Sequence, residues 1–167
     1  GTIIHPGHIV GAGHPPVNPQ GHHNPKVFEA LAHGEPVTIP NFGMETVHHV
    51  HAIDVAGVFR AAIRAGGPSY GQSFHAVSPG AVTLRGYAKA VASWFGKEAN
   101  LVFKPFDEFR KDVAEADANE TYEHILRSPN HSMEKAKRLL GFIPSYSSLE
   151  SVKESLDWMI GHGVVEL

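Results

Sequence analysis

The sequence predicts a mixed α/β fold, and three observations support this. Short apolar runs with strand character alternate with longer segments whose apolar residues recur every three or four positions, as in helices. Prolines and glycines separate these segments, and no internal repeat is present. The 167 residues, of which 42% are hydrophobic and 19% charged, are enough for one globular domain with a core.

The first expected element is a strand at residues 2–5, followed by a polar loop rich in Pro, Gly and His from Pro6 to His23. A helix then starts at Asn24-Pro25, with Asn24 as its cap, and ends at Gly34. Residues 35–40 form a short strand bounded by prolines, which is typical of a sheet edge.

Three elements are expected in the middle of the chain: a strand at 46–51, a helix at 54–65 and a strand at 72–77. In the first of these strands, His49 and His51 share one face and His48 points to the other. Asp54 is expected to cap the helix that follows.

The remainder of the chain predicts mainly helices. Its expected elements are a helix capped by Thr83, a strand at 101–103, helical pieces within 106–124, a helix from Ser132 to Gly141, and a final helix. Ser147 and Glu150 have the spacing of a capping box at the start of this final helix.

Charge and composition exclude several classes of protein. The net charge of -3 gives no electrostatic reason to expect binding to nucleic acid or to an anionic membrane. No apolar run approaches 18 residues, and no secretory signal opens the sequence. We therefore expect a cytoplasmic location and no membrane association. Without cysteine, the chain has no disulfide, thiolate metal site or thiol nucleophile.

Thirteen histidines are the one unusual feature of the composition. Most are interpreted as scattered surface and loop residues. A metal site would require three or four converging ligands, usually with carboxylates among them. His49 and His51, on one strand face, are the candidates for such a site.

Four segments match, in order, the later part of a known enzyme family: Thr2–Gly13, Val50–Ala56, Gly71–Val77 and Lys135–Pro144. Through them the chain resembles the carboxyl-terminal half of an extended short-chain dehydrogenase/reductase of the NAD(P)-dependent epimerase/dehydratase group. The resemblance implies the carboxyl-terminal part of an NAD(P)-binding Rossmann-fold enzyme, with the last strands of the parallel sheet and a small mixed α/β substrate-binding domain. Residues 1–13 and 47–80 would belong to the Rossmann sheet, and residues 14–46 and 81–167 mainly to the substrate-binding domain.

Two motifs of that family are missing from this sequence. It has no GxxGxxG turn for the dinucleotide, and none of its four tyrosines has a lysine four residues later. The resemblance places both motifs before Gly1, so we expect a fragment that is inactive alone, with NAD or NADP bound mainly by the missing half. The expected partners are a small-molecule substrate, the amino-terminal half of the same enzyme and, as an option, a second copy in a homodimer.

The resemblance also implies roles for individual residues. Pro6, Gly7 and Ile9 match the turn whose backbone binds the nicotinamide carboxamide. His8 and His23 fall where sugar-nucleotide epimerases usually carry asparagines near the substrate, and a histidine keeps hydrogen-bonding capacity there. The full expected substrate-binding set is His8, His23, Asn24, His49 and His51.

The substrate itself is left open by one departure from the family. Nucleotide-sugar enzymes tend to carry an arginine that grips the diphosphate near the strand at 45–51, and this strand has none. The leading hypothesis is therefore the substrate-binding portion of an NAD(P)-dependent epimerase, dehydratase or reductase that acts on a sugar-like or small hydroxy or carbonyl compound. A non-catalytic small-molecule binding module and a histidine-rich metal-binding protein are the alternatives.

Overall fold

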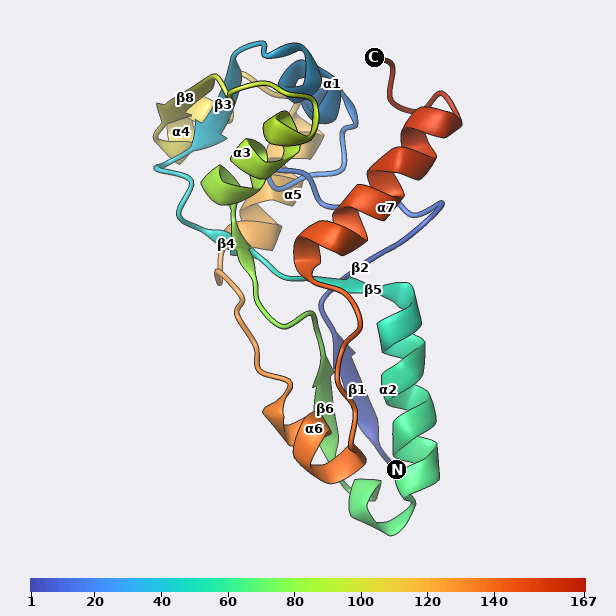
Figure 1. The fold of residues 1–167 in the computed structure, drawn as a ribbon. Helices are drawn as coiled ribbons and strands as arrows, with labels where there is room; N and C mark the ends of the chain where they lie inside the picture. Colours follow the sequence, from blue (N-terminus) through green and yellow to red (C-terminus); the bar gives the residue numbers. More distant parts are fainter.

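The computed structural model describes all residues from Gly1 to Leu167. The chain forms an elongated α/β structure with two parts (Figure 1), which confirms the predicted fold class. The part that holds the amino terminus contains β1 (Ile3–Pro6), β6 (Ser73–Ala76), α2 (Ala52–Ala65), the short 3₁₀ turn η1 (Gly67–Ser69) and α6 (Glu134–Leu140). No helix combines the length and apolar content needed to cross a bilayer.

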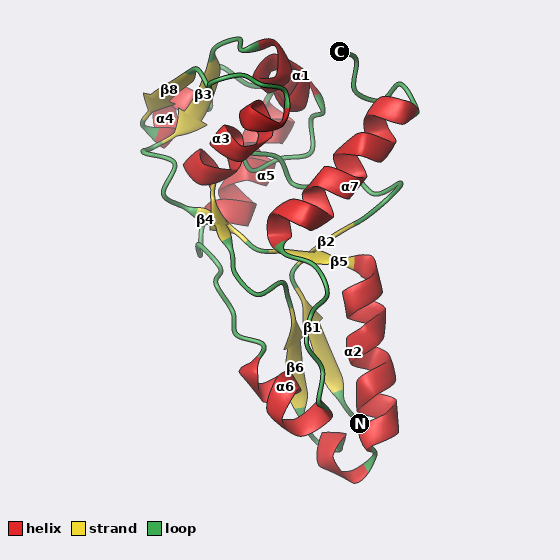
Figure 2. Cartoon of the chain, in the orientation of Figure 1, coloured by secondary structure: helices red, strands yellow, loops and turns green.

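The second part contains most of the helices, and its strands are short (Figure 2). Its elements are α1 (Lys26–His33), β3 (Val37–Pro40), β4 (Thr46–Val47), β7 (Val82–Thr83), α3 (Leu84–Trp94), β8 (Leu101–Lys104), α4 (Phe106–Phe109), α5 (Glu115–Ile125) and α7 (Ser148–Gly161). Between the two parts lie β2 (His8–Val10) and β5 (His49–His51). Most of residues 81–167 lie in the second part, whereas α6 packs with β6 and α2 in the first.

Every sheet in the structure has only two strands. Three pairs are parallel, β1 with β6, β2 with β5 and β3 with β8, and β4 pairs antiparallel with β7. In the β1–β6 pair, Ile3 lies opposite Ser73 and His5 opposite His75, and all four of these side chains are exposed on one face. The other face packs against α2 and α6. This parallel pair is therefore covered on one side only.

Two separate hydrophobic cores support the two parts. The larger one is formed by the apolar stripes of α1, α3 and α7 together with residues of β3, and includes Phe28, Leu31, Ile39, Tyr87, Val91, Leu156 and Met159. The smaller one comprises only Val50, Val55, Val58, Phe74, Ala76 and Ala136. The helical periods read from the sequence thus correspond to real buried faces.

Gly7 lies where the chain passes from β1 to β2. Its N–H donates to the Ala76 carbonyl at 3.0 Å, and the N–H of the next residue, His8, donates to the His48 carbonyl at 2.9 Å. The chain therefore leaves one sheet and enters the next at a single residue. A Cβ atom at position 7 would lie 2.4 Å from the His48 oxygen, so only glycine fits there.

Two predictions about strands were wrong, and one strand was missed. The expected loop from Pro6 to His23 contains β2, which pairs with β5. The expected strand at 46–51 divides at His48, because β4 and β5 pair with different strands. β7, with two residues, was not predicted at all. In each case the strand is defined by a distant partner.

The helix caps were predicted better, with two exceptions. Thr83 accepts a hydrogen bond from Gly86 N–H, and the Ser147–Glu150 capping box is present. Asn24 is the first exception: its Oδ1 accepts from the Lys26 N–H, but Pro25 occupies the cap position of α1.

Asp54 is the second exception, because α2 begins two residues earlier than expected. His51 is its cap, and its Nδ1 accepts from the Ile53 N–H at 3.2 Å. The Asp54 carboxylate is buried and accepts hydrogen bonds from the N–H groups of Ser145 and Tyr146 instead. It fixes the chain that leads into α7.

Replacing Gly7 by alanine should destabilise the fold. The added methyl group meets the His48 carbonyl, and overpacking of this kind costs about 1–3 kcal/mol. Urea unfolding of G7A should show a lower midpoint than the parent chain. Gly67→Ala is the matched control, since its methyl group has no neighbour within 4 Å. Equal midpoints for G7A and G67A would contradict the close approach at Gly7.

Candidate functional site

An open cavity of about 470 Å³ lies beside the carboxyl end of β1. Pro6, Gly7 and His8 lie on its wall, so three residues predicted from the sequence come together there. In α/β sheets the carboxyl ends of parallel strands are where ligands bind. The cavity is lined by five imidazoles and no acidic side chain: His5, His8, His48, His75 and His131.

His8 belongs to β2, and its side chain lies between this cavity and α5. Its ring lies 4.9 Å from the His124 ring and 6.0 Å from the His49 ring, centroid to centroid. Its Nδ1 is buried without a hydrogen-bond partner in the protein. Burial, together with repulsion from His124 and His23, lowers the pKa of His8 to about 4. The ring is therefore neutral at pH 7 and can both donate and accept a hydrogen bond.

His23 is held by a carboxylate on α5. Its Nδ1 lies 2.5 Å from Glu120 Oε1, and its backbone N–H donates to Glu120 Oε2 at 3.1 Å. Burial alone would raise the pKa of Glu120, but the bonds from His23 outweigh it and lower that pKa. Glu120 is thus ionised and fixes the orientation of the His23 ring.

His124 lies one helical turn from Glu120 and connects His23 with His8. Its ring is 5.5 Å from that of His23 and nearly perpendicular to it, as it is to the ring of His8. Its Nδ1–H donates to the Gly21 carbonyl at 2.7 Å. The three imidazoles form a row from the cavity to the surface at Glu120.

Asn24 lies in a different place. Its amide nitrogen donates to Asp117 Oδ2 at 3.1 Å, and its amide oxygen accepts from the Lys26 N–H at 3.1 Å. It lines a separate cavity of about 370 Å³, together with His22 and Lys26. The structure does not bring Asn24 to the cavity beside His8.

His49 and His51 are outside the cavity as well. His49 is fully buried, and its Nε2–H donates to the Val17 carbonyl at 2.9 Å. His51 caps α2, stacks on Tyr146 at 4.0 Å and lies 3.1 Å from Glu154 Oε1. Burial lowers the pKa of His49 to about 3. Both rings are used in joining the two parts of the chain.

No three His, Asp or Glu side chains are arranged to hold a metal ion. The geometry therefore gives no support to the metal-binding alternative, for which His49 and His51 were the candidates.

The turn at Pro6-Gly7 has fewer free backbone groups to hydrogen-bond a cofactor than expected. The N–H groups of Gly7 and His8 already donate within the protein. Ile9 lies within β2 and does not line the cavity. Any contact that this turn makes with a cofactor must use its other backbone groups.

Sequence reasoning missed several residues of this region, among them His75, His131, Glu120 and His124. One signal was available: His5 and His75 lie on two strands that were predicted for the same sheet. His131 precedes α6 in a loop, and the residues of α5 fall in a segment whose helices were not located from the sequence. Nothing local links either of them to His8.

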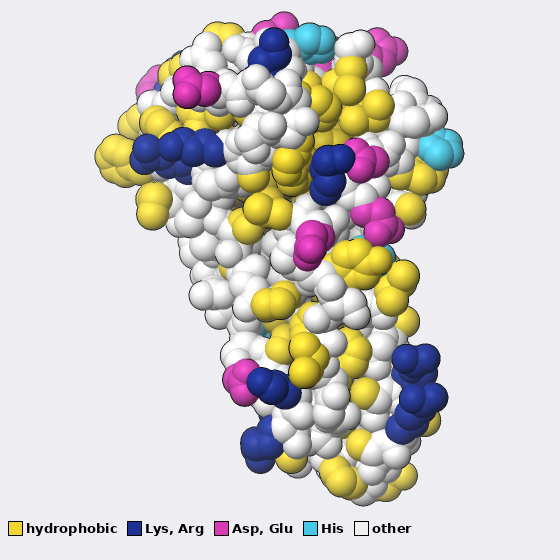
Figure 3. Space-filling model, viewed as in Figure 1, with side chains coloured by type: hydrophobic (Ala, Val, Ile, Leu, Met, Phe, Trp, Pro, Cys, Tyr) yellow, Lys and Arg dark blue, Asp and Glu magenta, His cyan; other side chains and the backbone are white.

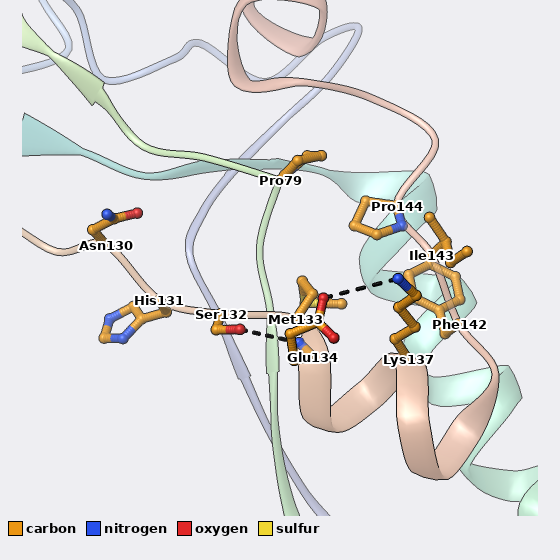
Figure 4. A pocket seen from close by; sticks show the side chains of 10 residues that line it. All are labelled: Pro79, Asn130, His131, Ser132, Met133, Glu134, Lys137, Phe142, Ile143 and Pro144. Carbon is orange, nitrogen blue, oxygen red and sulfur yellow. Dashed lines mark hydrogen bonds and ion pairs between the residues drawn. The ribbon is translucent and has the colours of Figure 1, made fainter.

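A further cavity of about 370 Å³ lies between α6 and the chain leading to α7 (Figure 4). Met133, Phe142, Ile143 and Pro144 supply its apolar lining. Its polar groups interact with one another: Ser132 Oγ accepts from the Glu134 N–H, and Glu134 lies 4.0 Å from Lys137 Nζ. It contains none of the predicted site residues.

Several solved structures share this arrangement. An epimerase from Methanothermobacter thermautotrophicus is 18% identical with a TM-score of 0.66, over 98% of this chain and 44% of its own. A UDP-glucuronic acid 4-epimerase from Bacillus cereus, in complex with UDP-glucuronic acid and NAD, is 15% identical with a TM-score of 0.63, over 96% and 45%. A UDP-glucose 4-epimerase from Thermotoga maritima is 21% identical with a TM-score of 0.61, over 96% and 46%.

This is the fold of part of a sugar epimerase. The chain spans less than half the length of these epimerases. No protein-family model matches the chain, and no curated protein sequence matches it. Identities of 15–21% establish the epimerase fold and leave activity to be argued from the site.

The buried imidazoles should make the fold sensitive to acid. The pKa values of His8 and His49, about 4 and about 3, lie below their ordinary value of 6.5. As the pH falls below 6.5, the unfolded chain binds protons that the folded chain does not, so stability decreases until the folded pKa values are reached. Urea unfolding should show about 1–3 kcal/mol less stability at pH 5 than at pH 7.

His49→Gln should reduce this difference, and His162→Gln, at an exposed site, should leave it unchanged. Equal stability of the parent chain at pH 5 and pH 7 would contradict the buried neutral imidazoles.

Proposed function

We propose that this chain is the carboxyl-terminal, substrate-binding portion of an NAD(P)-dependent epimerase, dehydratase or reductase. Its substrate would be a sugar-like or small hydroxy or carbonyl compound. The observation that supports this most is the one-sided β1–β6 sheet within an epimerase fold. Parallel sheets are normally covered on both faces, whereas here one face is exposed.

The surface around β1 has features that favour the binding of another segment. Ile3 is 59% exposed, and β1 pairs with only one strand. Phe59 and Ile63 of α2 and Tyr70 lie exposed beside it, around a cavity of about 410 Å³. Figure 3 shows hydrophobic and basic side chains together over the α2 region. Exposed strand edges with apolar neighbours favour pairing with another segment, which in our proposal is the amino-terminal half of the same enzyme.

The residues of this chain do not form a dinucleotide site by themselves. No helix here starts from a glycine-rich turn that could receive a pyrophosphate, and the tyrosine–lysine pair is missing. In the proposed enzyme the other half would hold NAD or NADP, whose nicotinamide would exchange a hydride with the substrate. The residues of this chain would bind and orient that substrate.

His8 is the residue best placed for this role. It is neutral at pH 7, lies on the wall of the cavity and follows the carboxyl end of a sheet strand. A neutral imidazole can hydrogen-bond a substrate hydroxyl or carbonyl. His23, oriented by Glu120, and His124 extend the same row of rings and would complete the polar side of the site.

The missing arginine argues for a substrate other than a nucleotide-diphosphate sugar. Two of the similar epimerases are described with UDP-sugars. In this chain the segment at 45–51 carries histidines in place of a diphosphate-binding arginine, and those of β5 are buried. We therefore propose a smaller substrate, or one with a different charge.

The isolated chain should bind neither NAD nor NADP tightly and should turn over no substrate. Isothermal titration calorimetry of the chain with each nucleotide should give no saturable heat at micromolar concentrations. The same chain joined to the polypeptide encoded upstream of it should bind one of them and produce a substrate-dependent change at the absorbance of the reduced nicotinamide. Micromolar NAD binding by the isolated chain would overturn the proposal.

In that joined protein, His8→Ala should lower kcat/KM by about 10-fold or more, because one hydrogen bond to the substrate is lost. Affinity for NAD(P) and the melting temperature should change little. His162→Ala is the matched control and should behave like the parent. Unchanged kinetics with a lowered melting temperature would show that His8 only packs.

A further inference from the structure

Three neighbouring rings behind the cavity carry polar atoms that have no partner in the protein. The centroid of the His49 ring lies 6.0 Å from that of His8 and 5.3 Å from that of Tyr87. Four side-chain polar atoms of the chain are buried without a hydrogen-bond partner, and three of them belong to these rings: His8 Nδ1, His49 Nδ1 and the Tyr87 hydroxyl. Because buried polar groups are nearly always hydrogen-bonded, this clustering indicates a shared partner.

The hydrogen bond from His49 to the backbone fixes the position of its ring proton. Its Nε2 lies 2.9 Å from the Val17 carbonyl oxygen, which can only accept, so Nε2 carries the proton. Burial lowers the pKa of this ring to about 3, so the ring is neutral at pH 7 and has no second proton. His49 Nδ1 is therefore a hydrogen-bond acceptor, and its partner must be a group that donates.

The Tyr87 hydroxyl can both donate and accept. Tyr87 belongs to α3 and is fully buried in the larger core, and burial raises the pKa of its hydroxyl well above the usual range. The hydroxyl therefore keeps its proton at neutral pH. It makes no direct bond to His49 Nδ1 although the two rings are neighbours. A small molecule between the two atoms would satisfy both of them.

Water is the molecule that meets these requirements. The shared partner must donate to His49 Nδ1 and must be small enough to lie between neighbouring rings. No three His, Asp or Glu side chains are arranged to hold a metal ion. A buried water makes about three hydrogen bonds to protein groups that would otherwise be unsatisfied. Three such atoms are present on these rings.

We propose that His8, His49 and Tyr87 bind an internal water, and that this water holds the His8 ring in place from behind. A bond at the buried Nδ1 of His8 leaves the other edge of its ring, with Nε2, for the cavity. His49 and Tyr87 are then positioning residues that act on the candidate site through His8. The water site depends on atoms buried within this chain, whereas its effect on a substrate rests on the proposed function.

The variant Tyr87→Phe in the isolated chain tests the water site. If the hydroxyl had no partner, its removal would leave the melting temperature unchanged or raise it, because an unsatisfied polar group would leave the core. With a bound water the variant should melt about 2–4 °C lower, the effect of losing about one hydrogen bond in a domain of this size. Tyr122→Phe is the matched control, since the Tyr122 side chain is 50% exposed, and it should melt like the parent.

Nuclear magnetic resonance of the same proteins tests the connection to His8. In the parent chain we expect a cross-peak between water and the Tyr87 hydroxyl proton. The imidazole ¹⁵N resonances of His8 and His49 should move in Tyr87→Phe and stay in place in Tyr122→Phe, with circular dichroism showing that both variants are folded. The inference is overturned if Tyr87→Phe melts at or above the parent temperature, if the water cross-peak is absent, or if the His8 resonances do not move.

In the joined protein, Tyr87→Phe should lower kcat/KM by about fivefold and leave the affinity for NAD(P) unchanged, because His8 is held less precisely. Kinetics like those of the parent would overturn the positioning role.

The two proposals fail separately. A water site in the isolated chain, with no cofactor binding in the joined protein, would remove the proposed function and leave the water site. Absence of the water site, with activity that depends on His8 in the joined protein, would remove this inference and leave the proposed function.

Discussion

The close approach of Gly7 to the His48 carbonyl is the constraint on which the rest of the structure depends. At this residue the chain stops pairing with β6 and starts pairing with β5, through two backbone hydrogen bonds about 3 Å long. The change of partner places His8 at the junction of the two parts and sets the position of the cavity beside it. A side chain at position 7 would push β2 away from β5, and both the cavity and the buried histidines behind it would be altered.

The helices of this fold could be predicted from the sequence because their information is local. The apolar period of α3 and the capping box of α7 lie within a dozen or so residues, and both were identified. The strands β2 and β7 could not be predicted, since two or three residues carry no period and each depends on a partner far along the chain. Asp54 has a cap-like position in the sequence, but its hydrogen bonds go to residues 145–146.

The same difference between local and distant information applies to the candidate site. Pro6, Gly7 and His8 lie together on the cavity wall, as expected for a turn that follows a strand at the carboxyl edge of a sheet. His131 was not found, because its place over His75 results from a hydrogen bond to His48, 83 residues away. His49 and His51 were expected at the substrate, yet both rings bond to the protein itself at the junction of the two parts. The presence of a histidine in a strand does not by itself show whether its ring faces a ligand or joins two segments of the protein.

The difference in size between the two cores has a consequence for how the molecule responds to its surroundings. The smaller core has six buried residues, and one edge of its sheet is available for pairing. In our proposal the segment that pairs with β1 belongs to the amino-terminal half of the same enzyme, and it would stabilise the folded form of this part and not the unfolded one. The stability of the β1–β6 unit would then depend on the rest of that enzyme, whereas the larger core is buried by residues of this chain.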